Sequence, residues 1–165
     1  MKFDPHTVQS RFQSPLGAIT LAASPVGLCG LWFDGQKHQP DSSAWPVAAP
    51  NHPVLQQAHE QLQSYFAGDT TAWTVPLDLR GGTAFQQAVW QALLAIPRGH
   101  TTSYGALSQQ IGHPAAVRAL GAAVGRNPVS IVVPCHRVLG KDGALTGYAG
   151  GLDRKTALLQ LEGAL

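Results

Sequence analysis

The chain has 165 residues, 44% of them hydrophobic, and a formal net charge of +2. This length suffices for one domain or two small ones with a buried core, and the apolar fraction excludes a disordered chain. No apolar run approaches a membrane span, residues 1–20 lack the apolar stretch of a secretory signal, and two cysteines cannot make a disulfide scaffold. We expect a cytoplasmic protein with reduced thiols that does not enter a membrane.

The first third of the chain predicts β-structure. Two Ser-Pro-x-Gly turns, at residues 14–17 and 24–27, separate short apolar runs. Proline presets φ and glycine accepts the positive φ that such turns often need, so a meander of short strands is expected. A polar, proline-rich loop follows over residues 36–51. A helix is then expected from Pro53 to Phe66, because its apolar residues share one face, and Gly68 ends it.

The segment LRGGT, residues 79–83, is typical of a linker, and beyond it the pattern changes to helices. A helix capped by Thr83 is expected to stop at Pro97–Gly99. The apolar side chains that this helix would bury are Phe85, Val89, Leu93 and Ile96. We therefore predict an α+β protein, with a small β-rich N-terminal domain over residues 1–80 and a helical C-terminal domain over residues 81–165.

Two short helices are expected next, Ser103–Ile111 and a second that begins with Pro114 at its first helical position. A tight glycine-containing turn between them gives the helix-turn-helix pattern, in a winged-helix-like domain, although an ordinary helical hairpin has the same pattern. The residues of the second helix, RALGAAVG, are nearly all small apart from Arg118. Such a surface fits close packing in a core, or insertion into the narrow minor groove of DNA.

Charge is unevenly distributed along the chain. Residues 1–81 carry four Lys or Arg against six Asp or Glu, whereas residues 82–165 carry seven against three. A basic C-terminal half suits an anionic partner such as DNA, and a solvated surface with a chance imbalance is the alternative.

The stretch VVPCHRVLG, residues 132–140, places Cys135 between a proline and a histidine. A free cysteine is most often a small buried hydrophobe, which is how we interpret Cys29 in LCGLWF. Cys135 differs, because His136 and Arg137 favour the thiolate, which is the nucleophilic form. Adjacent side chains of an extended chain point to opposite faces, so a turn or a bridging water must join Cys135 to His136. Because no Cys-x-x-Cys motif or metal-ligand set surrounds the thiol, we expect neither a metal nor a cofactor.

The segments NPVSIVVPCHRVLG and TGYAGGLDRKTALLQLEG closely resemble the O6-alkylguanine-DNA alkyltransferases, or methylated-DNA–protein-cysteine methyltransferases. The resemblance continues through FQQAVWQALLAIPRGHTTSYGALSQQIG and VRALGAAVGRNP, and covers nearly all of residues 83–163. It implies DNA repair by direct and irreversible transfer of the alkyl group from O6-alkylguanine, and from O4-alkylthymine, to a cysteine. Each molecule would act once, because the thioether that forms has no route back to the thiol.

The resemblance also assigns catalytic roles to matching residues. Cys135 would accept the alkyl group, and His136 would act as its base through a water. Glu162 would orient His136, as in a cysteine-protease triad, and Asn127 would brace the active-site turn.

Substrate-binding residues are implied in the same way. The residues expected to form the guanine pocket are Tyr104, Val138, Tyr148, Ala149 and Gly150. Arg118 would enter the base stack where the flipped nucleotide leaves, Tyr104 would push the neighbouring phosphate, and Lys141 would reach a phosphate. The implied partner is double-stranded DNA with alkylated bases, bound by a monomer through the minor groove.

Two departures from the family pattern matter. Several members have serine where Ala149 stands, so a hydroxyl contact to the base is missing here. Cys29 is the only N-terminal cysteine, so the structural zinc that some members bind there is not expected.

Two alternative functions remain, an alkyltransferase-like protein that binds the lesion without repairing it, and a small helix-turn-helix regulator. Alkyltransferase-like proteins lack the cysteine, so the presence of Cys135 argues against the first.

Overall fold

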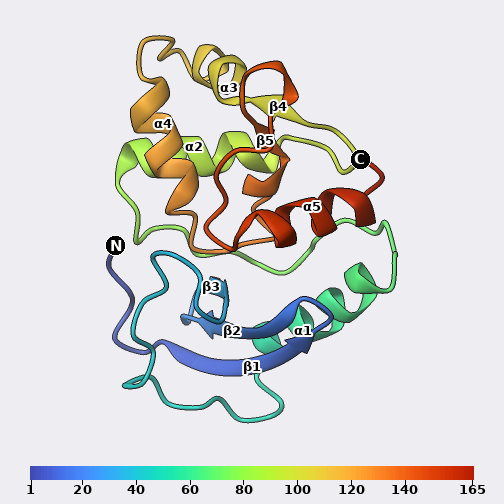
Figure 1. The fold of residues 1–165 in the computed structure, drawn as a ribbon. Helices are drawn as coiled ribbons and strands as arrows, with labels where there is room; N and C mark the ends of the chain where they lie inside the picture. The colour runs from blue at the N-terminus through green and yellow to red at the C-terminus, as the bar shows by residue number, and fades with distance from the viewer.

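A computed structural model describes all residues, 1–165, and shows two lobes that meet along one broad face (Figure 1). The elements of the N-terminal lobe are β1 (Val8–Ser14), β2 (Gly17–Ala23), β3 (Leu28–Phe33) and α1 (Pro53–Phe66). Those of the C-terminal lobe are α2 (Ala84–Leu94), β4 (Thr102–Ser103), α3 (Tyr104–Gln110), α4 (Val117–Gly125), the short 3-10 helix η1 (Cys135–Arg137), β5 (Val138–Leu139), a second 3-10 turn η2 (Lys141–Gly143) and α5 (Leu152–Leu161). The predicted α+β class is confirmed.

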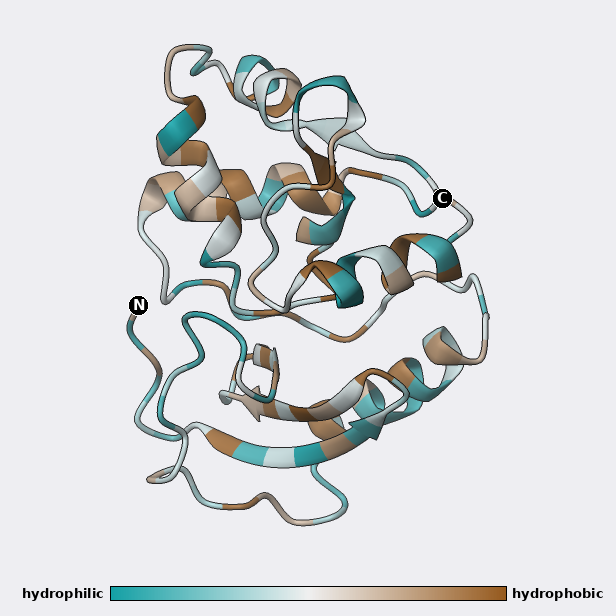
Figure 2. Cartoon of the chain, in the orientation of Figure 1, coloured by the Kyte–Doolittle hydropathy of each residue, from teal (hydrophilic) through white to brown (hydrophobic).

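The N-terminal lobe is the expected meander with one helix on it. Strands β1, β2 and β3 pair antiparallel in sequence order, and the first turn is closed by the Ser14 hydroxyl, which donates to the carbonyl of Gly17 at 2.6 Å. Gly17 has φ +117°, a conformation that favours glycine. Hydrophobic and hydrophilic residues alternate along β1, whereas β3 is buried along its whole length (Figure 2). Helix α1 has the predicted bounds, Pro53–Phe66.

Helix α2 begins as predicted, and of the side chains expected to be buried, Val89, Leu93 and Ile96 are buried whereas Phe85 is only partly so. Thr83 accepts from the backbone amide of Gln86 while the Gln86 side chain accepts from the Thr83 amide, which makes a capping box. The helix ends at Leu94, before Ile96. Trp90 is also completely buried, and its indole donates to the carbonyl of Ala123 in α4 at 2.9 Å. No helix of the chain is both long and apolar enough to cross a membrane.

Helices α3 and α4 pack against each other across a tight turn, and α4 corrects one prediction. It begins at Val117 rather than at Pro114. Residues 113–116 instead form a turn in which the amide of Ala116 donates to the carbonyl of His113 at 2.9 Å. Ala116 has no side chain that could cap a helix, and no other side chain caps this one. Helix α4 therefore starts at Val117, after this turn, without a capping side chain.

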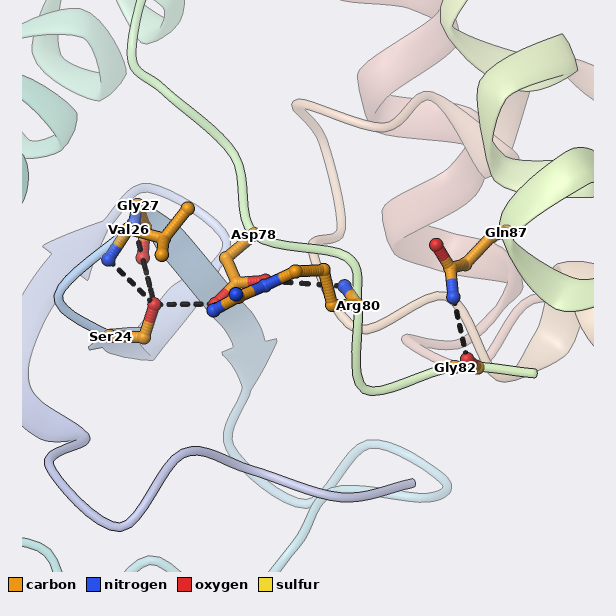
Figure 3. Close-up of polar contacts among 7 residues, drawn as sticks. All are labelled: Ser24, Val26, Gly27, Asp78, Arg80, Gly82 and Gln87. Carbon is orange, nitrogen blue, oxygen red and sulfur yellow. Dashed lines mark hydrogen bonds and ion pairs between the residues drawn. The ribbon is translucent and has the colours of Figure 1, made fainter. Parts of the chain in front are cut away.

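The segment that connects the lobes, residues 78–82, is held by side-chain hydrogen bonds at both of its ends (Figure 3). The Ser24 hydroxyl donates to the carboxylate of Asp78 at 2.5 Å, and the same carboxylate pairs with Arg80 at 2.9 Å. Farther along, the Gln87 side chain donates to the carbonyl of Gly82 at 2.8 Å. One continuous hydrophobic core includes residues of both lobes. A domain boundary at residue 80 therefore stays a prediction.

Acid should reveal the contribution of Asp78 to stability. The hydrogen bonds from Arg80 lower the pKa of Asp78 from 3.8 to about 2, against the effect of burial. Its stabilisation is therefore present above pH 4 and is lost as pH falls from about 4 to 2. We expect the difference in unfolding free energy between the wild type and Asp78→Asn to be constant above pH 5 and to shrink over that range in urea titrations. Glu60→Gln, at an exposed carboxylate without an ion pair, is the control. A difference that does not change with pH would contradict this account.

Candidate active site

The loop before Cys135 is held in an unusual conformation. Ile131 has φ +72°, which is strained for a β-branched residue and persists only where its surroundings enforce it. The Asn127 side chain supplies part of that enforcement, because it donates to the carbonyl of Val133 at 2.7 Å and accepts from the amide of Val129 at 3.0 Å.

Strand β3 of the other lobe holds the same loop from outside. The amide of Leu31 donates to the carbonyl of Pro128 at 2.8 Å, and the amide of Ser130 donates to the carbonyl of Leu31 at 3.1 Å. The position of the thiol thus depends on backbone pairing between the two lobes.

The 3-10 helix η1 turns His136 inward toward α5. His136 is completely buried, and its Nε2 lies 2.7 Å from Oε1 of Glu162, which caps the C-terminal end of α5. Because an ionised carboxylate only accepts hydrogen bonds, the neutral imidazole carries its proton on Nε2. Nδ1 is buried without a partner among protein atoms. The ring therefore keeps a free lone pair on the nitrogen that does not face Glu162.

The carboxylate of Glu162 is the most heavily hydrogen-bonded group of the site. Its Oε1 also accepts from the Tyr65 hydroxyl at 2.8 Å and from Nη2 of Arg137 at 2.9 Å, while Oε2 accepts from Nε of Arg137 at 2.9 Å. Burial would raise the pKa of Glu162, but the donors His136 and Arg137 lower it to about 2. Burial lowers the pKa of His136. At neutral pH the pair is therefore a carboxylate beside a neutral imidazole.

Burial of Cys135 disfavours the thiolate, which is the reactive form of its side chain. Burial raises its pKa to about 11, and the nearby Asn127 amide and Lys155 ammonium oppose that effect only partly. Lys155 is itself fully buried, and its ammonium donates to the carbonyls of Val138, Thr146 and Gly147 at 2.6, 2.8 and 3.1 Å. Burial lowers the pKa of Lys155 to about 8. No feature of the sequence distinguished this lysine from a surface residue.

A cavity of about 170 Å³ opens at the sulfur. Its lining residues are Lys37, His38, Tyr104, Gly121, Val124, Gly125, Cys135, Gly147, Tyr148 and Ala149. Three of the expected pocket residues, Tyr104, Tyr148 and Ala149, line it. Val138 and Gly150 do not, which differs from the expectation. Val138 is buried in β5, and Gly150 lies behind Tyr148, where an added Cβ would come within 2.7 Å of the tyrosine ring.

The residues expected to contact DNA lie around one open surface groove next to this cavity. Its lining residues are Ser103, Tyr104, Gly105, Val117, Arg118, Gly121 and Lys141. Arg118 is exposed on α4, Lys141 is exposed in η2, and Tyr104 faces both the groove and the cavity. Among the small residues of α4, Ala123 packs into the core and Gly121 lines the surface groove.

Comparison with known proteins relates both halves of the chain to the same family. The DNA-binding domain of 6-O-methylguanine DNA methyltransferase matches residues 84–164, and the ribonuclease-like domain of the same family matches residues 8–79. A methylated-DNA–protein-cysteine methyltransferase of Mycobacterium bovis is 51% identical over 149 residues, which are 90% of this chain and 88% of that protein. One from Methanosarcina acetivorans is 46% identical over 154 residues, 93% of this chain and 96% of that protein.

Solved structures agree. The crystal structure of Mycobacterium tuberculosis O6-methylguanine methyltransferase superimposes with a TM-score of 0.85 at 47% sequence identity, over 96% of this chain and 93% of that one. The Mycobacterium tuberculosis protein in complex with DNA gives the same TM-score and coverage.

The buried ion pair should matter far more to stability than an exposed one of similar length. Arg137 and Glu162 are almost completely buried, whereas Arg11 and Asp34 form a pair at 2.6 Å with half-exposed side chains. Arg137→Met leaves a buried carboxylate short of donors and should cost about 3–5 kcal/mol of unfolding free energy. The control Arg11→Met should cost at most about 1 kcal/mol. Urea denaturation at pH 7 measures both values, and equal losses would contradict the assigned burial.

Proposed function

This chain belongs to the 6-O-methylguanine DNA methyltransferase family, and from that premise we propose that Cys135 is the residue to which it transfers the alkyl group. The activity is direct repair of DNA, with the protein's own cysteine as acceptor. The observation that supports Cys135 most is that this residue, only 5% exposed, lines the cavity and is followed directly in η1 by His136, which pairs with Glu162. Cys29 is buried elsewhere, and burial together with the charge of Asp78 raises its pKa to about 11.

In this proposal His136 acts as the base and Glu162 orients it. Glu162 accepts the Nε2 proton of His136, so the lone pair of Nδ1 remains to take the thiol proton through a bridging water. The imidazolium that forms is stabilised by the carboxylate behind it. Asn127 acts as a brace, because its amide holds the strained turn that presents the sulfur.

The reaction forms one bond and breaks another. The Cys135 thiolate attacks the alkyl carbon on O6 of guanine, a carbon–sulfur bond forms, and the carbon–oxygen bond breaks with its electrons going to the base. The guanine leaves as an anion assisted by the Tyr104 hydroxyl, or as a neutral base once the proton taken from the thiol reaches it. A thioether has no good leaving group, so each molecule acts once.

The substrate alkyl group lies on a base edge inside the duplex, so the nucleotide must leave the stack, at a few kcal/mol of lost stacking and pairing. We propose that Arg118 fills the space it vacates and that Lys141 binds a phosphate, with α4 in the minor groove. Support comes from the groove that Arg118, Lys141 and Tyr104 share beside the cavity. Tyr148 and Ala149 would face the flipped guanine, with Val138 and Gly150 supporting that wall from behind.

Several finer points belong to the same proposal. O4-alkylthymine is a second substrate, and the protein acts as a monomer in the cytoplasm. Residues 1–80 and 81–165 are its two domains. Neither a metal nor a cofactor takes part in the transfer as written, because the thiolate, the base and the leaving group account for every proton and electron pair.

Mass spectrometry of protein incubated with a duplex containing O6-methylguanine tests the central assignment. One methyl group per molecule is expected on the peptide that contains Cys135, and none on Cys29. Cys29→Ser should react like the wild type, whereas Cys135→Ser should not react. Methylation of the Cys135→Ser protein would overturn the assignment, and binding without transfer by the wild type would indicate a lesion-binding protein instead.

A further inference from the structure

Two residues of the N-terminal lobe line the cavity that holds the thiol, although nothing in the sequence connected them with it. Lys37 and His38 follow β3 in a short turn, and both side chains are exposed at the mouth of the cavity that Cys135 lines. All its other lining residues come from the C-terminal lobe. The mouth is therefore built from both lobes.

This turn is fixed against the cavity wall rather than free to move away. The amide of Lys37 donates to the carbonyl of Ala149 in the wall at 3.0 Å. The neighbouring Gln36 side chain is buried, and its Oε1 accepts from the amide of Phe33 at the end of β3 at 2.8 Å. His38 has φ +64°, a left-handed conformation that is uncommon outside glycine and indicates that the surroundings hold the turn.

Lys37 is the only lysine or arginine among the lining residues, and it makes no ion pair. The nearest acidic residue in the turn, Asp34, is already occupied by two hydrogen bonds from Arg11 at 2.8 and 2.6 Å. An uncompensated ammonium at the mouth of a cavity attracts an anion. A nucleotide that leaves the duplex brings its own phosphodiester to the same mouth, and lysine binds phosphate as a point charge.

We propose that the turn Lys37–His38 is a DNA contact of the N-terminal lobe, in which the Lys37 ammonium binds the phosphodiester of the flipped nucleotide while the base occupies the cavity. The inference rests on the proposed function. It adds a contact from the N-terminal lobe to those proposed for Arg118 and Lys141 in the C-terminal lobe, so that both lobes bind the flipped nucleotide.

Binding and reaction are measured separately to test this contact. In a Cys135→Ser background, which cannot react, affinity for a duplex containing O6-methylguanine is followed by fluorescence anisotropy as a function of salt. Lys37→Ala should weaken binding several-fold at low salt and reduce the slope of log affinity against log salt by about 0.9, the release of one counterion. Lys37→Arg should restore both. Lys2→Ala, an exposed lysine of the same lobe that does not line the cavity, is the matched control.

Free O6-benzylguanine has no phosphate, so with Cys135 intact the Lys37→Ala and wild-type proteins should be alkylated by it at the same rate. An unchanged salt slope, or a change equal to that of Lys2→Ala, would overturn the proposal, as would equal rate losses on duplex and free base. Failure of the wild type to accept any alkyl group would instead overturn the proposed function, so the two failures are distinguishable.

Discussion

A buried carboxylate must find donors for its lone pairs, and Glu162 finds them on two separate segments of the chain, α1 and η1. Tyr65 of α1, His136 of η1 and Arg137 next to it all donate to its two oxygens. Desolvating an ion is expensive unless such partners are in place, so these segments must converge for the charge to be tolerated. The end of α5, the helix of the N-terminal lobe and the reactive turn are thus fixed together by one group, and the same group gives His136 its tautomer.

The second constraint is the conformation of the loop that carries the thiol. Ile131 is strained, and the strain is maintained by Asn127 from within the loop and by backbone pairing with Leu31 of β3 from outside. The N-terminal lobe therefore shapes the site at three places, through β3, through Tyr65 and through the turn at Lys37. The β-rich lobe is part of the structure that positions the sulfur and frames the entrance to it.

How much the sequence could predict follows from the range of the interactions concerned. Helix Pro53–Phe66 and the Thr83 cap depend on neighbouring residues, and both were predicted, whereas the start of α4 was misplaced because Pro114 suits a turn as well as a first helical position. Cys135 was singled out from the chemistry of its neighbours His136 and Arg137, and the roles of His136, Glu162 and Asn127 were assigned by resemblance. Tyr65 was not found, since it lies 97 residues from Glu162, and Lys155 and Lys37 were missed because only the folded chain brings them to the site. Val138 and Gly150 were predicted at the pocket, and neither is among its lining residues.

The central claim is that burial suppresses the ionisation of Cys135 and that His136 with Glu162 restores it. It is tested most directly by the rate of alkylation by free O6-benzylguanine between pH 5 and pH 11 in the wild type and in Glu162→Gln, with folding verified by circular dichroism. The account predicts that the variant is slowest relative to the wild type near neutral pH and that the two rates converge as pH approaches about 11, where the thiol ionises unaided. A ratio of the two rates that stays constant over the whole range would contradict it.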